Sequence, residues 1–394
     1  MSAQRTIYIA GAGIAGLTLA LALAKFGLHV VVLERNAEIS QFGAGLQISP
    51  NARKILNGLG LDDALRAKSF EPQGIDIYPD GRKSPLQTLT LGSAIAERFG
   101  APYAVMHRAD LVEILFGAAK RFANIDIVFG VSDIAVGRAL GDLLVTAVEP
   151  DGKKRRVKPF AFVGADGVRS KTRTSVIGGP EAQYTGKVAW RALISPRELE
   201  PTLDLTRTSL LLGTKFHLVV YPLPHRDAVN LALFTQEPAN ALDRLDARQP
   251  DLKSRGNARL AGILQAVGAN WTPWVLSTIE TGTWHIDDVG LIGDAAHAML
   301  PFQAQGAAMA IEDAAVLAPL LAASPSASHA FSRFAALRRD RVQRVQEISR
   351  QNGRVFHMGW PLALARNAVI RIEGARGHFK RLDWLFGYEP SRGT

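Results

Sequence analysis

Three glycines stand at a spacing that suits phosphate binding: GAGIAG, with Gly11, Gly13 and Gly16, follows a short apolar run and opens a helical one. The first glycine permits a tight turn, the second lets backbone approach a pyrophosphate, and the third allows close helix–strand packing. The phosphates then meet free amides at the positive end of the helix dipole. Glu34 ends the next apolar run, where a carboxylate can accept hydrogen bonds from an adenosine ribose. The sequence therefore predicts a dinucleotide site, for NAD or for FAD.

A histidine and a tyrosine stand four residues apart in HLVVYPL, a run with the composition of a β-strand. Because side chains alternate along a strand, His217 and Tyr221 share one face, with Val219 between them. Imidazole titrates near neutral pH, and a phenol hydroxyl can orient either the imidazole or a substrate. Such a pair is suited to deprotonation of a phenol. The competing interpretation is a buried histidine that only satisfies a local hydrogen bond.

The elements that must position these residues differ between the ends and the middle of the chain. Buried strands and helices alternate at both ends: the patterns predict strands at 6–10, 29–33, 125–129, 131–136, 143–148, 161–165 and 289–292, and helices at 14–26, 108–122, 306–323 and 328–351. From about 183 to 280, alternating runs predict an antiparallel sheet with strands at 209–212, 217–221 and 229–234, followed by a helix at 258–267. The two lobes are therefore expected to interleave.

Two more segments end predicted strands in an aspartate. GADGVRS runs from Gly164 to Ser170, and GDAAH begins at Gly293. Together with GAGIAG and Glu34, these segments resemble the class A flavoprotein aromatic hydroxylases, and most of all the salicylate hydroxylase-like branch with its hydroxybenzoate and hydroxynicotinate monooxygenases. The similarity continues through GAGLQISPNA, HRADL, AWRALI, HLVVYPL, QGAAMAIEDA and DWLFGYEP, and so covers nearly the whole chain.

The resemblance implies an α/β fold like that of p-hydroxybenzoate hydroxylase. A Rossmann-like FAD-binding domain is interleaved with a smaller substrate domain made mostly of antiparallel sheet, and the C-terminus is helical. We expect the first part of the FAD-binding domain at 1–180, the substrate domain at 181–282, and the second part with the C-terminal helices at 283–394.

The resemblance also implies FAD as cofactor and NADH or NADPH as co-substrate. The implied cofactor-binding residues are Gly11, Gly13, Ala15, Gly16, Glu34, Arg35, Arg108, Val131, Asp166, Asp294, Gly306 and Ala307. Asp294 is expected to accept a ribityl hydroxyl, the amides near Gly306 to face the pyrimidine edge of the flavin, and the Asp166 segment to serve both FAD and NAD(P)H. Ala304 stands where relatives usually have glycine. Since alanine favours an ordinary φ, we expect a slightly different loop shape there.

Other residues are candidates for the substrate pocket. Gln47 and Phe302 are expected to line it, and Arg191 to meet an anionic substrate or the nicotinamide. His297 is either a structural cap or a catalytic group. The remaining histidines show no metal-ligand spacing, so no metal site is expected.

The composition fits a soluble, globular protein of two lobes. The chain has 394 residues, 47% of them hydrophobic, no cysteine, and a net charge of +10. Basic residues are scattered, and the run KKRR at 153–156 follows a turn, so small anionic ligands are favoured over nucleic acid. The apolar N-terminal run contains three regularly spaced glycines, which argues against a signal peptide or a membrane span. A cytoplasmic monomer or homodimer is expected.

The expected activity is FAD-dependent, NAD(P)H-consuming monooxygenation of a small aromatic compound, a hydroxylated aromatic acid, by O2 through a flavin C4a-hydroperoxide. His217 takes the phenolic proton, with Tyr221 beside it. The alternative is a flavin monooxygenase or epoxidase that acts on a non-phenolic or larger polycyclic substrate. The non-enzyme alternative is a flavin-binding sensor that NAD(P)H cannot reduce.

Overall fold

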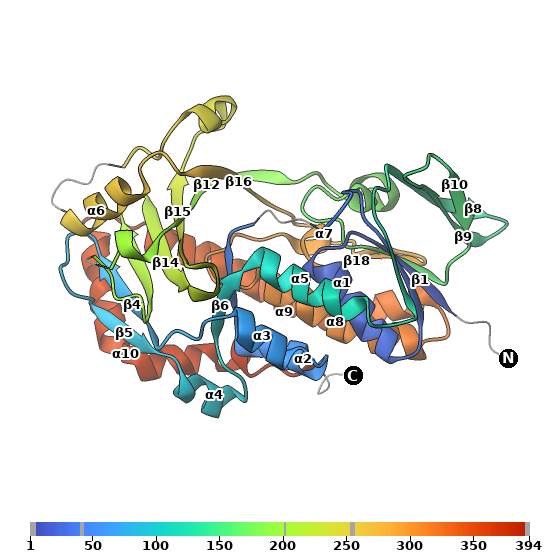
Figure 1. Cartoon of the computed structure of the whole chain (residues 1–394), viewed down its shortest axis with the longest axis horizontal. Coiled ribbons are helices and arrows are strands. Elements are labelled where there is room, and N and C mark those ends of the chain that lie inside the picture. The colour runs from blue at the N-terminus through green and yellow to red at the C-terminus, as the bar shows by residue number, and fades with distance from the viewer. Residues whose placement is uncertain (1–4, 40–42, 201, 253–256, 391–394) are drawn as a thin grey trace.

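A six-stranded, mostly parallel sheet forms one end of the molecule (Figure 1). The computed structural model describes residues 5–39, 43–200, 202–252 and 257–390. The sheet contains β1 (Thr6–Ala10), β2 (His29–Leu33), β7 (Ile125–Val128), β11 (Ala161–Gly164), β17 (His285–Ile286) and β18 (Val289–Leu291), in the order β17-β18-β11-β1-β2-β7. All neighbours are parallel except β17 and β18. The carboxyl ends of β1, β2, β11 and β18 therefore meet at one edge.

Helices cover this sheet and tie it to the rest of the chain. α1 (Ile14–Lys25) packs on α5 (Arg108–Ala119) and on α8 (Gly306–Ala323), and α8 packs on α2 (Pro50–Gly58) and α9 (Ala327–Phe356). α8 is long and apolar enough to cross a membrane by length and composition, but two-thirds of it, 67%, is buried inside the molecule. Its surroundings make α8 a core helix.

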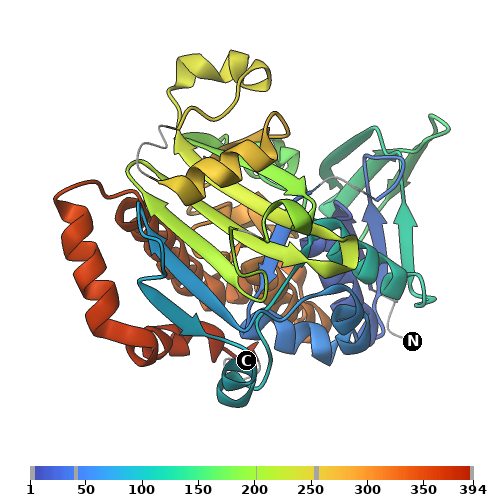
Figure 2. The ribbon, with the colours of Figure 1, turned by 60° about the vertical axis from the view of Figure 1, so that its left-hand side comes forward.

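A seven-stranded sheet forms the other end. It contains β4 (Gly74–Pro79), β5 (Gln87–Thr90), β12 (Gln183–Ile194), β13 (Thr208–Gly213), β14 (Phe216–Leu223), β15 (Ala228–Gln236) and β16 (Thr272–Thr278), in the order β16-β12-β15-β14-β13-β4-β5. α6 (Ala258–Val267) lies across one face (Figure 2). There Leu260 and Ile263 share a core with Leu218 and Val220.

The membership of this sheet corrects the predicted domain boundaries. β4 and β5 lie within the segment 1–180 that we assigned to the FAD-binding domain, yet β4 pairs in parallel with β13. The second sheet therefore takes in residues 74–90 as well as strands from 183 to 278. The reason is that the place of a run such as GIDIYP in a sheet depends on contacts that lie far along the chain, which no local pattern shows.

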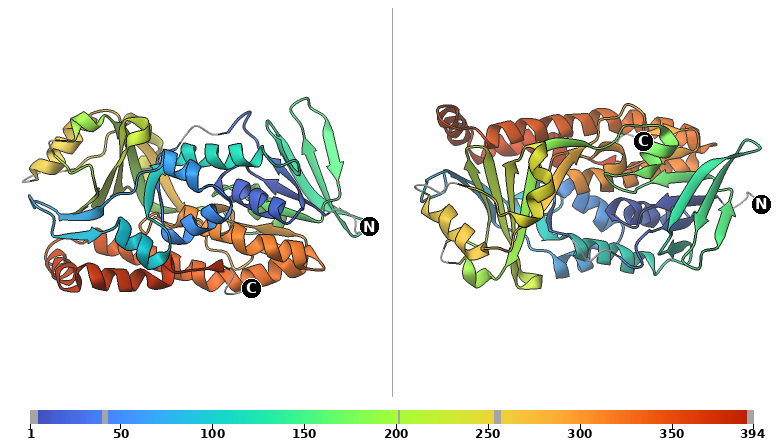
Figure 3. Two further views of the ribbon diagram at one scale, coloured as in Figure 1. Left: turned by 60° about the horizontal axis from the view of Figure 1, so that its bottom comes forward. Right: turned by 90° about the horizontal axis from the view of Figure 1, so that it is seen from above.

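The remaining elements surround the two sheets. β3 (Gly45–Ile48) pairs with β6 (Ala104–His107), and β8 (Asp133–Ala139), β9 (Asp142–Val148) and β10 (Lys154–Val157) form a separate three-stranded sheet. Shorter helices are α3 (Asp62–Lys68), α4 (Ser93–Phe99), α7 (Asp294–His297), the π-helix η1 (Thr172–Ile177), and the 3-10 segments η2 (Pro196–Glu198), η3 (Pro224–Arg226) and η4 (Ala239–Ala247). α9 and α10 (Leu362–Phe386) run along one side of the molecule (Figure 3).

The predicted fold class is confirmed: a Rossmann-like parallel sheet, a mainly antiparallel second sheet and a helical C-terminus interleave along the chain. The strands at 6–10 and 29–33 and the helices at 258–267 and 306–323 have the predicted bounds. Among the described elements, the patterns missed β3 to β6, β10, β17, α2 to α4, α7 and α10, and they gave no bounds for β12 and β16. Most of these elements are short, and a short run shows too few residues to establish a period.

Candidate active site

The GAGIAG turn has the geometry of a phosphate cradle. Gly11 has φ +104°, and a Cβ there would lie 2.6 Å from the carbonyl oxygen of Ala165. A Cβ on Gly16 would lie 2.0 Å from the carbonyl oxygen of Gly11. Around Gly13, which begins α1, a Cβ would meet nothing within 4 Å, and no described side chain caps the helix. Two glycines are thus required for packing, while Gly13, with Ala15 in the same first turn, leaves the helix N-terminus open to a ligand.

Glu34 lies beside this turn. Its carboxylate accepts hydrogen bonds from the backbone amides of Ala12 at 2.8 Å and Asn36 at 2.9 Å. A carboxylate has about four acceptor positions, so two remain for ribose hydroxyls. Arg35 is exposed next to it, and the amide of Val131 donates to the carbonyl oxygen of Glu34 at 2.9 Å. The structure therefore brings the three predicted adenine-side residues together.

The carboxylate of Asp166 is turned back into its own segment. It accepts hydrogen bonds from the Ser170 hydroxyl at 2.6 Å and from the amide and hydroxyl of Thr172, each at 3.0 Å. Asp166 therefore fixes the entry to the π-helix η1. Any contact of this segment with FAD or NAD(P)H would come from its backbone or from the exposed Arg169 beside it.

A buried carboxylate fixes the turn at Gly293 and Asp294, which we call the GD turn. Asp313 on α8 accepts from the amide of Gly293 at 2.9 Å, from Nε2 of His297 at 2.6 Å, and from Arg338 at 2.8 Å. Burial alone would raise the pKa of Asp313, but His297 and Arg338 lower it to about 2. His297 is thus a structural residue, the first of the two predicted alternatives. Asp294, in contrast, is exposed at the edge of the sheet.

The N-terminus of α8 is also open. A Cβ on Gly306 would meet nothing within 4 Å, and no described side chain caps the helix. Gly306 and Ala307 are partly exposed, whereas the next residues are buried. The side chain of Gln305 points away, and its amide nitrogen donates to the Ser49 hydroxyl at 3.0 Å. The first amides of α8 are therefore available to a ligand.

The loop before α8 corrects one prediction. We expected an ordinary φ at Ala304, but its φ is +53°. The alanine adopts the left-handed conformation that glycine adopts more readily, because the amide of Ala304 is tied to the carbonyl oxygen of Pro301 at 3.0 Å in a tight turn. The loop keeps a glycine-like shape at the cost of local strain.

These features together fit FAD. The open helix N-termini of α1 and α8 suit its diphosphate and its flavin ring, and the carboxylates of Glu34 and Asp294 suit its sugar hydroxyls. A Cβ on Gly293 would lie 3.0 Å from Cβ of Ala15, so the two turns are in contact. Arg108 begins α5 with an exposed side chain and supplies positive charge nearby.

A second cluster lies on the face of the seven-stranded sheet that α6 leaves uncovered. Within β14, all residues are buried except Val219, and its cross-strand neighbours Leu210, Ala232 and Arg191 are also partly exposed. Strand pairing places these residues in one row across the sheet, from β13 to β12. This row is the part of the face that packing leaves partly exposed, whereas His217, Tyr221, Asn230 and Phe234 beside it are buried. We call this row the sheet hollow.

His217 lies at one border of the sheet hollow, in an aromatic cage. Its ring stacks on Phe234 with 4.5 Å between centroids and meets the edges of Phe302 and Phe356. Burial, and then the charge of neighbouring His357, hold the pKa of His217 well below its ordinary value. The imidazole is therefore neutral at neutral pH.

The hydrogen-bond partner of His217 is His357, which sequence reasoning missed. Nδ1 of His217 and Nε2 of His357 lie 2.8 Å apart. His357 directly follows α9, 140 residues beyond His217. A lone histidine at the end of a helix gives no sequence signal for this contact.

Tyr221 lies at the other border. It pairs across the sheet with Asn230, whose side-chain oxygen accepts from the amide of Gly45 at 2.8 Å. A Cβ on Gly45 would lie 2.3 Å from the Tyr221 hydroxyl oxygen. Glycine at this position thus allows β3 to approach the tyrosine. Burial raises the pKa of Tyr221, so the phenol stays protonated.

Gln47 and Arg191 complete the predicted pocket residues on this side. The Oε1 atom of Gln47 accepts a short hydrogen bond from the buried hydroxyl of Tyr103. Arg191 lies over the ring of Trp274 at 5.1 Å, its Nε is buried without a hydrogen-bond partner, and no described carboxylate is within ion-pair distance. Burial lowers the pKa of Arg191, and Arg108 adds to that effect. An anion in the sheet hollow would pair with this guanidinium.

Phe302 connects the two clusters. It belongs to the loop between α7 and α8, and its ring packs with Phe234, Leu300 and Ala189 against the sheet. A Cβ on Gly353 of α9 would lie 2.5 Å from the Phe302 ring, so the glycine leaves room for it. The loop that precedes the open N-terminus of α8 therefore also borders the sheet hollow.

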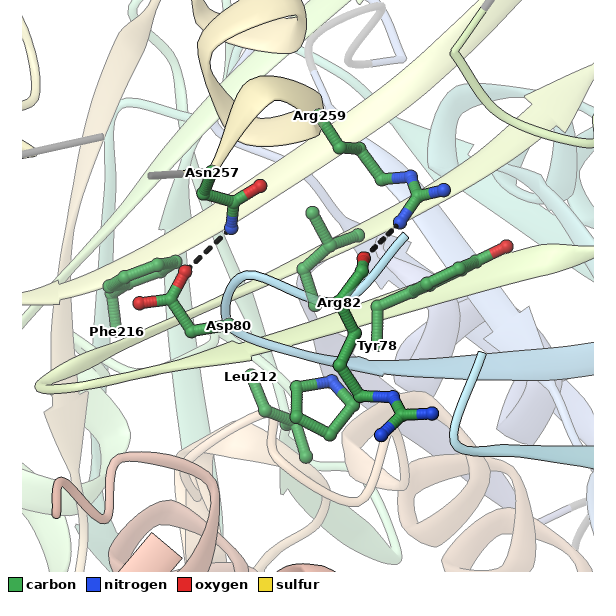
Figure 4. Close-up of a pocket in the computed structure, with 9 residues that line it drawn as sticks. Tyr78, Asp80, Arg82, Leu212, Phe216, Asn257 and Arg259 are labelled. Carbon is green, nitrogen blue, oxygen red and sulfur yellow. Dashed lines mark hydrogen bonds between the residues drawn. The ribbon is translucent and has the colours of Figure 1, made fainter. Parts of the chain in front are cut away.

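A shallow cavity near α6 is not part of this site (Figure 4). Several of its polar groups are already paired: Asn257 donates to Asp80 at 2.6 Å and Arg259 to the carbonyl oxygen of Arg82 at 2.8 Å. Phe216 lines it and faces away from the sheet hollow. Among the described residues, no group of three His, Asp or Glu side chains could hold a metal ion.

Comparison with known proteins agrees with this geometry. The family model described as "FAD binding domain" matches residues 4–351. The chain is 31% identical, over 397 residues, to 3-hydroxybenzoate 6-hydroxylase 1 of Aquipseudomonas alcaligenes, and the match covers 98% of each protein.

Two solved structures share the fold. Klebsiella pneumoniae HpxO complexed with FAD and uric acid matches with a TM-score of 0.83 and 23% identity, covering 98% of this chain and 97% of that one. A salicylate hydroxylase substrate complex matches with a TM-score of 0.77 and 22% identity, covering 100% and 98%. At sequence identities this low, the two structural matches show a shared fold and nothing further.

Proposed function

The chain belongs to the FAD binding domain family and is a flavin-dependent aromatic hydroxylase, and from this premise we propose that it hydroxylates a small aromatic acid bearing a phenolic hydroxyl, in the sheet hollow. The relative from Aquipseudomonas acts, by its name, on 3-hydroxybenzoate. NADH or NADPH supplies the electrons, and this need for reduced nicotinamide favours a cytoplasmic location.

The observation that carries the proposal is the position of the sheet hollow. Its floor consists of the small side chains Val219 and Ala232, with the imidazole of His217 at one end and the phenol of Tyr221 at the other. Flat apolar floors with a few polar groups at the rim suit aromatic ligands. A ring that lies on this floor can reach both groups.

The cofactor would bind at the neighbouring edge of the parallel sheet. Gly13, Ala15 and Arg108 would face its phosphates, Glu34 and Arg35 its adenosine, with backbone at Val131 beside them, and Asp294, Gly306 and Ala307 its flavin half. The chemistry that FAD supplies when bound is oxidation of NAD(P)H and transfer of one oxygen atom from O2 to the ring.

In this arrangement, the protein's own groups bind the acid and manage a proton. Arg191, whose Nε has no hydrogen-bond partner among the described residues, would pair with the substrate carboxylate. His217, neutral and desolvated, would accept the phenolic proton at Nε2. The aromatic ring of the resulting phenolate is richer in electrons than that of the phenol. Tyr221 stays protonated and would donate a hydrogen bond. Phe302 and the aromatic cage exclude water.

The test is a screen of benzoates, pyridine carboxylates and phenols for stimulated NAD(P)H oxidation, with product mass measured to exclude peroxide release. We expect a hydroxybenzoate-like compound to give a product heavier by one oxygen atom. A protein that purifies without flavin absorbance, or that no compound stimulates, contradicts the proposal.

Two variants separate the residue roles. His217→Phe should lower kcat on a phenolic acid about a hundredfold, the usual contribution of a general base. The matched control His285→Phe removes a histidine that stacks on Phe331, outside the site, and should retain activity. Arg191→Gln should raise KM for the acid but not for the corresponding neutral phenol. Full activity of His217→Phe would point to a non-phenolic substrate.

A further inference from the structure

His357 is held firmly at the point where it meets His217. Its carbonyl oxygen accepts from the amide of Lys215 at 3.1 Å, in the turn between β13 and β14. Nη1 of Arg366 on α10 donates to the carbonyl oxygen of Phe356 at 3.1 Å. The imidazole of His357 is nearly buried, with 7% of the residue exposed. Its position is thus fixed by both neighbouring elements, not by the histidine pair alone.

The contact between the two imidazoles restricts where their protons lie. A neutral imidazole carries one N–H and one lone pair, so only one of the two facing nitrogens, 2.8 Å apart, can hold the proton between them. Phe234 stacks on the His217 ring, Phe302 and Phe356 contact it edge to face, and none of these three rings offers a polar partner. Nδ1 of His357 is buried without a partner among the described residues. The proton between the rings therefore decides the state of Nε2 of His217.

The two arrangements have opposite consequences. If His357 donates to His217, Nε2 of His217 carries a hydrogen and cannot take a proton from a substrate. If Nδ1–H of His217 donates to His357, Nε2 of His217 carries a lone pair and can accept a proton from a substrate. A phenol in the sheet hollow is itself a hydrogen-bond donor, and only the second arrangement offers it an acceptor at Nε2.

We propose that His357 is a positioning residue for His217: it accepts the Nδ1–H hydrogen bond, and so holds the imidazole in the tautomer whose Nε2 lone pair meets the substrate. This rests on the proposed role of His217 as base. When Nε2 takes the phenolic proton, His217 becomes an imidazolium whose Nδ1–H still donates to His357, now as a stronger, charge-assisted bond. The phenol loses that proton and becomes a phenolate.

The charged surroundings keep the pair neutral before the substrate binds. Burial, and after it the ammonium of Lys187, lower the pKa of His357 to about 4. Lys187 also acts on His217, after burial and His357. No carboxylate is among the causes of either shift. The positive charge on His217 therefore forms only with a substrate that brings an anion.

The experiment reads the tautomer directly. Enzyme labelled with ¹⁵N-histidine and loaded with FAD is studied by NMR with a bound hydroxybenzoate and without NAD(P)H, so that no turnover occurs. His217→Phe assigns the signal. We expect the proton of His217 on Nδ1 in the wild type and in His357→Asn, whose side-chain oxygen still accepts a hydrogen bond. In His357→Phe we expect it to move to Nε2, with kcat lowered about tenfold or more and KM little changed.

Several outcomes overturn the proposal. A proton on Nε2 of His217 in the wild type with bound substrate contradicts it, without any variant having to fold. So does His357→Phe with unchanged tautomer and unchanged kcat, or a loss of kcat in His357→Asn as large as in His357→Phe. His285→Phe is the matched control and should change neither reading. If His217→Phe is fully active, the proposed base is wrong, while the tautomer measurement still tests the histidine pair.

Discussion

Ala304 carries a Cβ in a backbone conformation that glycine adopts at lower cost. Its φ of +53° lies in the left-handed region, in the loop that leads to the open N-terminus of α8. A residue with a Cβ is less stable in this conformation than glycine by about 1 kcal/mol. Part of this difference is offset because glycine loses more conformational entropy on folding. The expected flavin loop thus retains its shape although the sequence departs from the family pattern.

Ala304→Gly should therefore stabilise the protein by about 0.5–1 kcal/mol. The measurement is chemical denaturation of the apoprotein and the FAD-loaded protein. Leu140→Gly is a matched control, because Leu140 has φ +55° in a fully exposed hairpin turn. It should give a similar gain without any change in FAD affinity. A loss of stability in Ala304→Gly would show that φ at this position is ordinary.

The turns that we propose for FAD follow from local sequence patterns, whereas the contacts of His217 and Tyr221, the proposed catalytic pair, do not. Gly13, Glu34, Asp294 and Gly306 follow strand ends or begin helices, which are local patterns. His357 and Gly45 touch His217 and Tyr221 only because distant strands and helices meet. The sequence likewise left two interpretations of His297 open, and the buried Asp313 beside it decides between them.

At the scale of elements, α9 shapes the pocket through a missing side chain. Gly353 lies inside this long helix, where glycine weakens the helix by about 0.5–1 kcal/mol relative to alanine. The space above it is filled by the ring of Phe302, which also packs against His217. The helix gives up some intrinsic stability, and the loop before α8 gains a fixed position over the sheet.

Gly353→Ala should accordingly destabilise the protein by about 1–3 kcal/mol, as expected for an overpacked core, and raise KM several-fold. Thermal unfolding and steady-state kinetics measure the two effects. In the control Gly117→Ala on α5, a Cβ would meet nothing within 4 Å. That change should stabilise the protein by about 0.5–1 kcal/mol and leave KM alone. If both variants are equally stable, the ring of Phe302 does not rest on α9.

The patterns of β1, α1, β2, α6 and α8 sufficed to predict these elements, because each has an uninterrupted apolar run and a clear end. The pairing of β4 with β13 did not follow from any local pattern. Nor did the position of α10, whose exposed face carries Leu364, Val369 and Ile372. Long-range packing, not propensity, places these elements.

For the whole molecule, the buried histidine pair links stability to pH. The pKa of His357 falls from 6.5 to about 4 on folding, so between these values the unfolded chain binds a proton that the folded protein does not. Stability from this group is therefore fully present above pH 6.5 and is lost as pH falls toward 4. His217 shifts in the same direction.

We expect the wild type to lose about 2–3 kcal/mol more unfolding free energy between pH 7.5 and 4.5 than His357→Asn, which cannot titrate there. Urea denaturation of both proteins at several pH values measures this difference. Equal pH profiles would mean that His357 is as easily protonated in the folded protein as in the unfolded chain.

The membership of the seven-stranded sheet has a practical consequence for recombining this chain with its relatives. The two strands at one edge, β4 and β5, are encoded before residue 91, the other five strands lie between residues 183 and 278, and the histidine that contacts His217 comes after residue 356. Substrate preference therefore cannot be transplanted as one contiguous cassette. In a chimaera that exchanges only the middle of the gene, the new strands would pair with strands of the old parent and contact its histidine. A working chimaera must therefore take three separate segments from the same parent.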